Sequence, residues 1–372
     1  MRIALVVHDF NRTFGHGRYV VELASRYADA HDVHVFSNTY VNGPDRIRWH
    51  HVPAFRLSAL STIVSFYPAA TLALRGSFDI VHAQGFSVAG ANVVTAHISQ
   101  SRWLAARRAL CGGRLPWRER LFGSVVMPLE RRALGSPTAT VIAVSEALKH
   151  DIVDQGSSSN IVVIPHGVDA GQFNLGVRAR YRATARLEFG CSGDDEPLFL
   201  FVGDLRKGFA HAVAALRLSV GRLVAVSRSD PSEMLALARS LGVADRVQIQ
   251  PATTHIERCY AAADVFVFPT QYDAFGMVIT EAMACGLPVI TTSAAGAAEL
   301  IEHGRTGFVM SDPADEAALA SCMRVLAADP GLRQAIGDAA ADAMETHSWD
   351  NVASQTLAVY RQVASTPSPA RA

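Results

Sequence analysis

The sequence predicts an α/β protein built from two doubly wound domains, each a parallel sheet covered by helices. Short runs rich in Val, Ile and Phe alternate with longer helical stretches. Several of these runs are almost continuous Val and Ile, which is typical of strands buried on both faces. The alternation restarts near residue 198, and 372 residues is the length of about two such domains. Strand–helix–strand repetition of this kind predicts parallel sheets.

The first half of the chain begins with a buried strand and is expected to contain seven strands. These are expected at residues 3–7, 33–36, 48–52, 79–82, 92–95, 140–144 and 161–164, and helices near 17–28, 58–74, 117–135 and 146–155. The uncharged stretch 57–74 is about as long as the shortest membrane-spanning helix. Ser, Thr and Pro residues interrupt it, so a helix of a soluble domain is expected, with contact to a membrane surface as the alternative.

The second half repeats the pattern. Strands are expected at residues 198–202, 223–226, 247–249, 265–268 and 289–291, and helices near 209–219, 232–241, 255–262, 276–285, 297–302, 314–328, 331–345 and 349–363. The weakly periodic stretch from Gly167 to Pro197 is expected to be the linker. Ligands of doubly wound sheets bind at the carboxyl ends of the strands. The two domains are therefore expected to face each other across a central cleft at those ends.

Composition and charge exclude several classes of protein. Hydrophobic residues make up 49% of the chain and charged residues 18%, which excludes a disordered protein. The formal net charge is zero, so no nucleic-acid partner is expected. Residues 1–170 carry 17 Lys and Arg against 12 Asp and Glu, whereas the remainder carries 17 against 22. This asymmetry indicates different partners for the two halves.

Location is inferred from the cysteines and from the start of the chain. Five cysteines without disulfide or metal spacing are typical of reduced thiols in the cytoplasm. The opening MRIALVV is too short for the core of a signal peptide. A cytoplasmic protein is therefore expected, with a peripheral position on the inner face of the plasma membrane left open.

The segment 269–288 carries the strongest chemical pattern. Asp273 follows a buried strand, and a helix is expected to begin a few residues later. The helix start would offer unpaired N–H groups at Gly276 and Met277, which suit an anion. Glu281 lies about two turns further along the same helix. The alternative is that Asp273 only caps the helix and Glu281 is solvated.

A pair of cations, Arg206 and Lys207, follows the strand expected at 198–202. Glycines flank the pair at Gly203 and Gly208. The planar fork of Arg and the point charge of Lys suit a diphosphate. The alternative is a solvated charged turn.

The first strand is followed by Gly15 and Gly17. Position 20 is Val, so the dinucleotide-binding fingerprint fails. A short glycine loop would still let a ligand approach backbone amides, and a plain tight turn is the equal alternative. His97, in the sequence TAH, ends another strand at the side of the expected cleft.

In their order and spacing these motifs resemble the retaining glycosyltransferases of family 4, which have the GT-B fold of two Rossmann-like domains facing a central cleft. The resemblance spans residues 1–363. It is carried by the glycine loop and by the segments DIVHAQG, TAH, AVSEALK, IPHGVD, FVGDLRKG, DVFVFPTQYDAFGMVITEAMACGLPVI and GAAELIEHGRTGFV.

The resemblance implies an enzyme that moves a hexose-type sugar from a nucleotide sugar to a glycan or lipid-linked acceptor, as in bacterial surface polysaccharide synthesis. It implies no metal and no other cofactor. Residues 1–170 would bind the acceptor and 171–348 the donor. Residues 349–372 would form a helix packing back on the first domain, followed by a disordered tail from Ser365.

Carried over residue by residue, the resemblance implies two sets of site residues. The catalytic set would be His97 near the reacting sugar carbon, Lys207 at the phosphates and Asp273 at the sugar hydroxyls. The set that binds the donor would be Gly15, Gly17, Arg206, Lys207, Gly276, Met277 and Glu281, the last at the nucleotide ribose. Glu299, in GAAEL, would lie beneath the nucleotide.

Two positions depart from the family's pattern. Asp273 stands where the family usually has Glu and is shorter by ~1.5 Å. Asp204 stands where an Arg is frequent, so the positive charge is expected to have moved to Arg206. The alternatives within the same architecture are a nucleotide-sugar epimerase, a phosphorylase, or a nucleotide-sugar-binding protein without activity.

The segment 101–132 holds eight Arg against two Glu, interleaved with Trp, Leu and Phe. Such a surface suits an anionic membrane or a lipid-linked phosphate. A solvated helix face around a core is the alternative.

Overall fold

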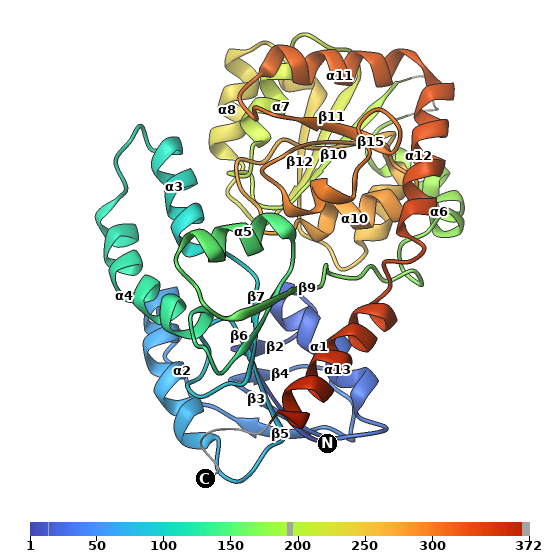
Figure 1. Ribbon diagram of the computed structural model, residues 1–372. Helices are drawn as coiled ribbons and strands as arrows, with labels where there is room; N and C mark the ends of the chain where they lie inside the picture. The colour runs from blue at the N-terminus through green and yellow to red at the C-terminus, as the bar shows by residue number, and fades with distance from the viewer. Residues whose placement is uncertain (14, 192–195, 367–372) are drawn as a thin grey trace. The chain divides into compact units, whose positions relative to one another are not determined.

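A computed structural model describes residues 1–13, 15–191 and 196–366 and divides into two compact units (Figure 1). Unit 1 comprises residues 1–166 and the described residues from Trp349 onward, and unit 2 comprises Gly167–Ser348. All strand pairings in the described residues are parallel. The prediction of two doubly wound α/β units is therefore confirmed.

The sheet of unit 1 has seven strands in the order β5-β3-β1-β6-β7-β8-β9. Their bounds are β1 (Arg2–Val6), β3 (Asp32–Ser37), β5 (Arg48–His51), β6 (Ile80–Gln84), β7 (Val93–Ala96), β8 (Thr140–Ala143) and β9 (Asn160–Val163). The chain runs outward from β1 to β5 and then returns to β6 on the other side of β1. The topological switch point, where such sheets bind ligands, lies between β1 and β6.

Helices cover both faces of this sheet (Figure 1). On one side α1 (Gly15–Tyr27) packs against α13 (Trp349–Ser365), and α2 (Ala59–Ala73) and α4 (Trp117–Leu134) lie on the other. α3 (Gln100–Leu110) packs on α4, and α5 (Glu146–Asp154) packs on β8 and β9. The hydroxyl of Tyr27 donates to the carbonyl of Ala353 at 2.7 Å, and the hydroxyl of Tyr360 is 2.6 Å from Nδ1 of His82. These buried contacts tie α13 to unit 1.

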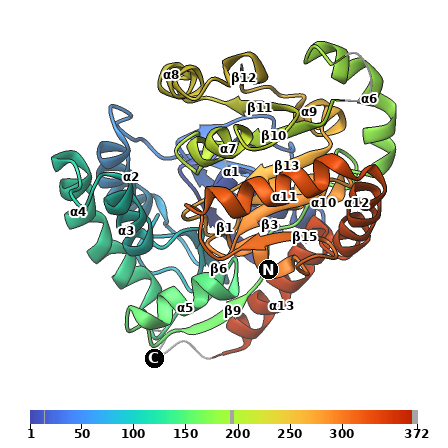
Figure 2. The same ribbon diagram turned by 90° about the horizontal axis from the view of Figure 1, so that it is seen from above.

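The sheet of unit 2 has six strands in the order β12-β11-β10-β13-β14-β15, so its switch point lies between β10 and β13. Their bounds are β10 (Leu198–Val202), β11 (Arg222–Ser227), β12 (Val247–Pro251), β13 (Val265–Phe268), β14 (Val289–Thr292) and β15 (Gly307–Met310). The helices are α6 (Leu175–Glu188), α7 (Phe209–Leu216), α8 (Ser232–Ser240), α9 (Ile256–Ala262), α10 (Met277–Ala284), α11 (Glu316–Ala328) and α12 (Pro330–Met344). α7, α8 and α11 lie on one face and α10 on the other (Figures 1 and 2).

The prediction of a linker at residues 167–197 is wrong, because this range contains α6. Three of its arginines, spaced four apart, face the protein: Arg182 and Arg186 bind the carboxylate of Asp264 at 2.7 and 2.9 Å, and Arg178 donates to backbone carbonyls. Arg186 is only 3% exposed. The helix packs through cations rather than apolar side chains, so a search for hydrophobic periodicity passes over it.

Smaller elements were also missed. α3, β15 and the two-residue strands β2 (Asp9–Phe10) and β4 (Thr39–Tyr40) are present without having been expected. Ser365, expected in a disordered tail, is the last residue of α13. The rest of that expectation, for residues 367–372, lies outside the described residues.

Candidate active site

Two loops of unit 2 meet at the carboxyl ends of β10 and β13. Gly208 makes their approach possible: it has φ +95°, and a Cβ there would lie 1.9 Å from the carbonyl oxygen of Pro269. No residue with a side chain fits this position without moving the backbone. The contact places Lys207, which follows β10, beside the loop that follows β13.

Asp273 is fixed by backbone bonds and paired with Lys207. Its N–H donates to the carbonyl of Ala294 at 3.0 Å, and its carbonyl accepts from the N–H of Gly296 at 2.9 Å. Its Oδ2 lies 2.6 Å from Nζ of Lys207, and its Oδ1 accepts from the N–H of Phe275 at 3.2 Å. The carboxylate therefore faces the cation, and the alternative that Asp273 only caps the following helix is wrong, since α10 has no side-chain cap.

The helix that follows begins at Met277, with Gly276 as its N-cap at φ +91°. In the described part of the chain, the backbone N–H groups of Gly276 and Met277 have no hydrogen-bond partner. Lone donors at a helix start form a site for negative charge. Gly276, Met277, Lys207 and Asp273 therefore gather at one place in unit 2.

Arg206 is paired differently from the expectation. Its guanidinium makes a fork with the carboxylate of Asp204, with Nε and Nη2 at 3.0 and 2.6 Å from the two oxygens. Partial burial raises the pKa of Asp204, but the hydrogen bonds from Arg206 outweigh this effect, and the pKa is lowered overall. The Asp that replaces the family's Arg thus offsets the charge of Arg206. Lys207 is the cation of this motif that faces Asp273.

Glu281 lies inside unit 2 rather than in solvent. It is 6% exposed and accepts a hydrogen bond from the hydroxyl of Tyr260 at 2.9 Å. Burial and the Glu281 carboxylate raise the pKa of Tyr260 well above its ordinary value. The alternative of a solvated Glu281 is therefore wrong. Glu299 is exposed, in the 3-10 helix η2 (Gly296–Leu300) next to the Asp273 loop.

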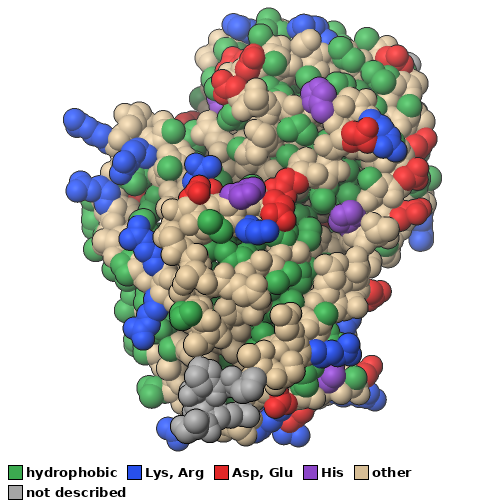
Figure 3. All heavy atoms as spheres, in the orientation of Figure 1, with side chains coloured by type: hydrophobic (Ala, Val, Ile, Leu, Met, Phe, Trp, Pro, Cys, Tyr) green, Lys and Arg blue, Asp and Glu red, His purple; other side chains and the backbone are tan. Residues whose placement is uncertain are grey.

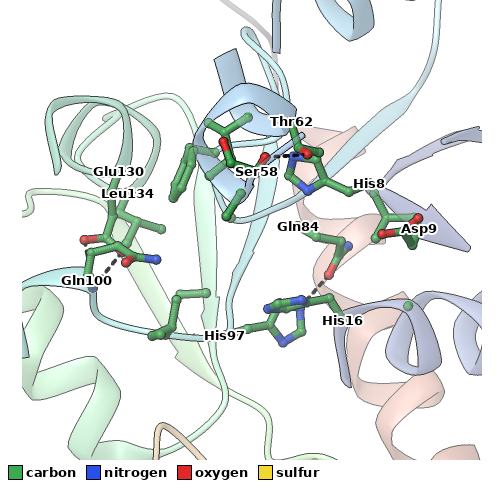
Figure 4. Close-up of a pocket in the computed structure, with 18 of the residues that line it drawn as sticks. His8, Asp9, His16, Ser58, Thr62, Gln84, His97, Gln100, Glu130 and Leu134 are labelled. Atoms are coloured by element: carbon green, nitrogen blue, oxygen red, sulfur yellow. Dashed lines mark hydrogen bonds between the residues drawn. The ribbon is translucent and has the colours of Figure 1, made fainter. Parts of the chain in front are cut away.

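Unit 1 holds a pocket of about 570 Å³ at its own switch point. Its wall follows the ends of β1, β6 and β7 and includes residues of α2 and α4. The lining residues are Val7, His8, Asp9, His16, Gly17, Arg56, Ser58, Ala59, Thr62, Ile63, Gln84, Gly85, Phe86, Ala96, His97, Ile98, Gln100, Glu130 and Leu134. Figure 4 shows Glu130 and Gln100 at one end of the pocket, His8 and Asp9 at the other, and Gln84 and His97 between them.

The two glycines expected to form a ligand loop lie instead in the first turn of α1. A Cβ on Gly17 would lie 2.4 Å from the carbonyl oxygen of Asn11 and 2.6 Å from that of Asp9. Packing of the backbone thus explains why Gly17 lacks a side chain, although the residue does line the pocket. Gly15 has nothing within 4 Å of that position and does not line the pocket.

His97 is held by two polar neighbours. Its Nε2 lies 2.7 Å from Oε1 of Gln84, and its Nδ1 lies 3.4 Å from Nε2 of His166, with the two imidazoles stacked. An amide oxygen only accepts, so Nε2 carries the proton and donates to Gln84. Burial, with nearby histidines, lowers the pKa of His97 well below its ordinary value. The imidazole is therefore neutral near pH 7.

Sequence reasoning missed three polar residues of these sites: Gln84, Glu130 and Tyr260. Gln84 could have been found, since it ends the strand in DIVHAQG. Glu130 and Tyr260 lie within helices, where only the fold turns them toward a pocket or a carboxylate. No sequence spacing relates Glu130 to His97 or Tyr260 to Glu281.

Two kinds of feature are absent from the part of the chain that the structure describes. None of its helices combines the length and the hydropathy that crossing a membrane would take. No group of three or more His, Cys, Asp or Glu side chains in that part is arranged to hold a metal ion.

Comparison with known families places this chain among the glycosyltransferases. The family described as "Glycosyltransferase Family 4" matches residues 15–172, and the family described as "Glycosyl transferases group 1" matches residues 196–329. Together the two matches cover most of the chain. The chain belongs to glycosyltransferase family 4, group 1, and the predicted resemblance is confirmed.

Individual relatives match over different lengths. The D-inositol 3-phosphate glycosyltransferase of Actinosynnema mirum is 32% identical over 228 residues, which is 55% of this chain and 52% of the relative. The first curated relatives are matched over 52% to 59% of their own length. The alpha-maltose-1-phosphate synthase of Mycobacterium tuberculosis is 28% identical over 396 residues, 98% of this chain and 100% of the relative.

Solved structures resemble the whole chain in fold. WaaG, a glycosyltransferase involved in lipopolysaccharide biosynthesis, has a TM-score of 0.82 and 22% identity, covering 96% of this chain and 99% of its own. HepE of Anabaena, in complex with UDP-glucose, has a TM-score of 0.73 and 19% identity, covering 97% of this chain and 100% of its own. These likenesses confirm the GT-B fold class.

Proposed function

We propose that this chain transfers a hexose-type sugar from a nucleotide sugar to a glycan or glycolipid acceptor, with retention of configuration. The observation that carries the proposal is the Lys207–Asp273 pair beside the N–H groups of Gly276 and Met277. This arrangement offers a cation and helix N–H groups for a diphosphate and a carboxylate for sugar hydroxyls.

In this proposal the groups of unit 2 act on the leaving diphosphate. Breaking the bond between sugar and phosphate leaves negative charge on the diphosphate oxygens. The Nζ of Lys207 and the N–H groups of Gly276 and Met277 stabilise that charge as it develops, because they are already in place. Glu281 binds the ribose, and Arg206, offset by Asp204, contributes less than Lys207.

His97 has the role that its neutral state allows. A neutral imidazole near the reacting carbon can make a hydrogen bond without adding a charge. No carboxylate in the proposed set is placed as a nucleophile for double displacement. The acceptor hydroxyl attacks on the face that the diphosphate leaves, and the leaving phosphate takes its proton.

The choice of first donor rests on the comparisons. HepE, of the same fold, is known in complex with UDP-glucose, which makes UDP-glucose the first donor to test. WaaG acts in lipopolysaccharide biosynthesis, and surface polysaccharide synthesis is the proposed setting for this chain too.

We also infer peripheral binding to an anionic membrane through α3 and α4. Figure 3 shows Lys and Arg side chains along the edge where these helices lie. Trp117 and Leu121 of α4 are 68% and 48% exposed, whereas Arg102 and Arg107 pair with Asp151 and Glu119. Exposed apolar side chains beside arginines suit an anionic bilayer interface. Sedimentation with anionic vesicles should exceed that with neutral vesicles and fall with salt; equal sedimentation with both would contradict the inference.

Two measurements on the purified protein test the enzyme assignment. Thermal shift with UDP-, GDP-, ADP- and TDP-sugars identifies the donor, because a ligand that binds the folded state raises its apparent stability. Nucleotide release with and without sugar acceptors then measures turnover. Release that rises with an acceptor supports transfer, whereas an altered nucleotide sugar with no release indicates an epimerase. Release of sugar phosphate from a glycan with inorganic phosphate indicates a phosphorylase, and binding without any turnover indicates a binding protein.

A further inference from the structure

The unit 1 pocket contains a buried acid without a counter-ion. Glu130, on α4, is 2% exposed, and both its oxygens accept from the N–H of Gln100, at 3.1 and 3.2 Å. Among the described residues, no Lys, Arg or His nitrogen lies within salt-bridge distance of this carboxylate. Burial raises the pKa of Glu130 to about 7, against lesser opposing effects of Gln100 and Arg131.

The other charged groups of the pocket are already neutralised. Arg56 makes two bonds to the carboxylate of Asp9, one of them Nη2 to Oδ2 at 3.1 Å, so this pair carries no net charge. Burial lowers the pKa of His8 to about 4, and the pKa of His16 and that of His97 are lowered as well. All three imidazoles are therefore neutral at neutral pH.

The two arginines that follow Glu130 in α4 belong to a different surface. Arg131 and Arg132 line a separate hollow beside Tyr67 and Thr138. Among the described residues that line it, the unit 1 pocket therefore holds no cation that is not already paired, and their one uncompensated group is acidic. An anionic ligand entering it would lose its hydration and meet Glu130 without a counter-charge.

Size and lining fit a small polar ring. A pocket of about 570 Å³ falls within the range of ~300–1,000 Å³ common for small-molecule sites. Side chains such as Ile63, Phe86 and Ile98 make much of its wall apolar. Gln84 adds a buried amide nitrogen that has no hydrogen-bond partner in the described part of the chain. A carboxylate at one end satisfies hydroxyl or ammonium donors, because it can only accept when ionised.

We propose that Glu130 selects the acceptor by its charge. The unit 1 pocket binds a sugar ring that is uncharged or carries an amino group, and it excludes a ring that carries a phosphate or carboxylate there. The proposal rests on the proposed function, since it assumes that this pocket receives the acceptor. One relative is named D-inositol 3-phosphate glycosyltransferase, after a phosphorylated polyol. The proposal distinguishes this chain from that relative by the charge of the ring that the pocket accepts.

The test uses three matched probes that differ in one substituent: methyl glucoside, methyl glucosaminide and methyl glucuronide. Their binding to the full chain is measured by ligand-observed NMR at one pH near 7.5. We expect the neutral and cationic glycosides to bind at least about tenfold more tightly than the glucuronide, which corresponds to one unfavourable charge contact. Comparable binding of the glucuronide, or binding of none of the three, overturns the proposal.

Three variants localise the effect. Glu130→Gln should reduce the ratio of glucoside affinity to glucuronide affinity several-fold. The amide oxygen of Gln still accepts from the N–H of Gln100, but the negative charge is lost. Glu119→Gln, on the same helix but paired with Arg107 outside the pocket, should leave the preference unchanged. Thr62→Trp should fill the pocket and abolish glycoside binding. Glycoside binding that survives Thr62→Trp, or a preference unaffected by Glu130→Gln, refutes the assignment.

Titration of UDP into the same samples separates this proposal from the proposed function. The proposed phosphate and ribose contacts (Lys207, Gly276, Met277 and Glu281) lie in unit 2, and none of the substituted residues belongs to the proposed donor set, so these variants should leave UDP binding unchanged. UDP binding with no glycoside discrimination removes the Glu130 proposal alone. Discrimination without binding of any nucleoside diphosphate removes the proposed donor site and leaves the sugar pocket standing.

Discussion

Replacing Lys207 with Ala gives the sharpest test of the donor site. The substitution removes a charge-assisted contact to phosphate, which contributes about 1.5–3 kcal/mol. It also exposes the phosphate to Asp273, whose Oδ2 lies 2.6 Å from the lost ammonium. Two like charges 4 Å apart repel by about 1 to 4 kcal/mol, depending on the surrounding dielectric. UDP binding should therefore weaken by at least ten- to a hundredfold, at 1.4 kcal/mol per decade.

The two contributions can be separated by calorimetric titration of UDP into Lys207→Ala, Asp273→Asn and the double variant. Because Asp273→Asn removes the repulsion, the double variant should bind UDP at least about fivefold more tightly than Lys207→Ala alone. The folded state should hardly change, since a pair with 42% and 16% exposed side chains contributes at most about 1 kcal/mol.

Lys149→Ala is the matched control, because Lys149 is 36% exposed and pairs with Glu146 at 3.2 Å. It should bind UDP as the parent does. If Lys207→Ala binds UDP as tightly as the parent, or Lys149→Ala loses as much, the assignment of the phosphate site is refuted.

Three further predictions follow from the packing. Tyr260→Phe removes the hydrogen bond that the Tyr260 hydroxyl donates to the buried Glu281. It should therefore lower the free energy of unfolding by about 1–3 kcal/mol and weaken nucleoside binding. Unchanged values in both measurements would contradict the ribose role. Glu130→Gln should stabilise the protein at pH 8 by up to ~3 kcal/mol and have little effect below pH 4.5. In the parent, the raised pKa of Glu130 favours the folded state at low pH and this advantage is lost as the pH rises toward about 7, whereas Gln carries no charge at any pH. A pH-independent difference in denaturant unfolding would refute the prediction. Gly208→Ala should cost more than about 2 kcal/mol in thermal unfolding, whereas Gly15→Ala, with open space around it, should cost little; equal effects would refute the steric reasoning.

The fold could be predicted where hydrophobic patterning is strong. The runs at Ile3, Phe199 and Phe266 are buried apart from Val202 at the end of the second run, and their strands lie within one or two residues of the expected bounds. α6 shows where such reasoning ends, because its inward face is made of arginines that bind Asp264 and carbonyls. Only the tertiary structure supplies those partners.

The candidate sites divide in a similar way. Lys207 and Asp273 could be proposed from sequence because each follows a buried strand, and strand ends meet at the edge of a parallel sheet. The offset of Arg206 by Asp204, two residues away, depends on rotamers that the sequence does not specify. The burial of Glu281 and Glu130 depends on which face of a helix packs inward, and for Glu130 also on the cavity beside it.

The two units show that net charge and local charge can point in opposite directions. Residues 1–170 carry the excess of basic residues, and the remainder carries the excess of acidic ones. Net charge alone would assign the diphosphate to unit 1. Yet eight arginines of unit 1 lie in the α3–α4 segment, while its pocket contains a paired Arg56, neutral histidines and the acid Glu130.

Unit 2, although acidic, places Lys207 and two N–H groups at its switch point. Because Coulomb energies inside a partly buried site exceed those across solvent, the local arrangement decides the ligand. In the proposed function, each unit therefore selects its ligand by the few charges at its switch point, and the surplus of arginine on unit 1 is available for the proposed membrane contact.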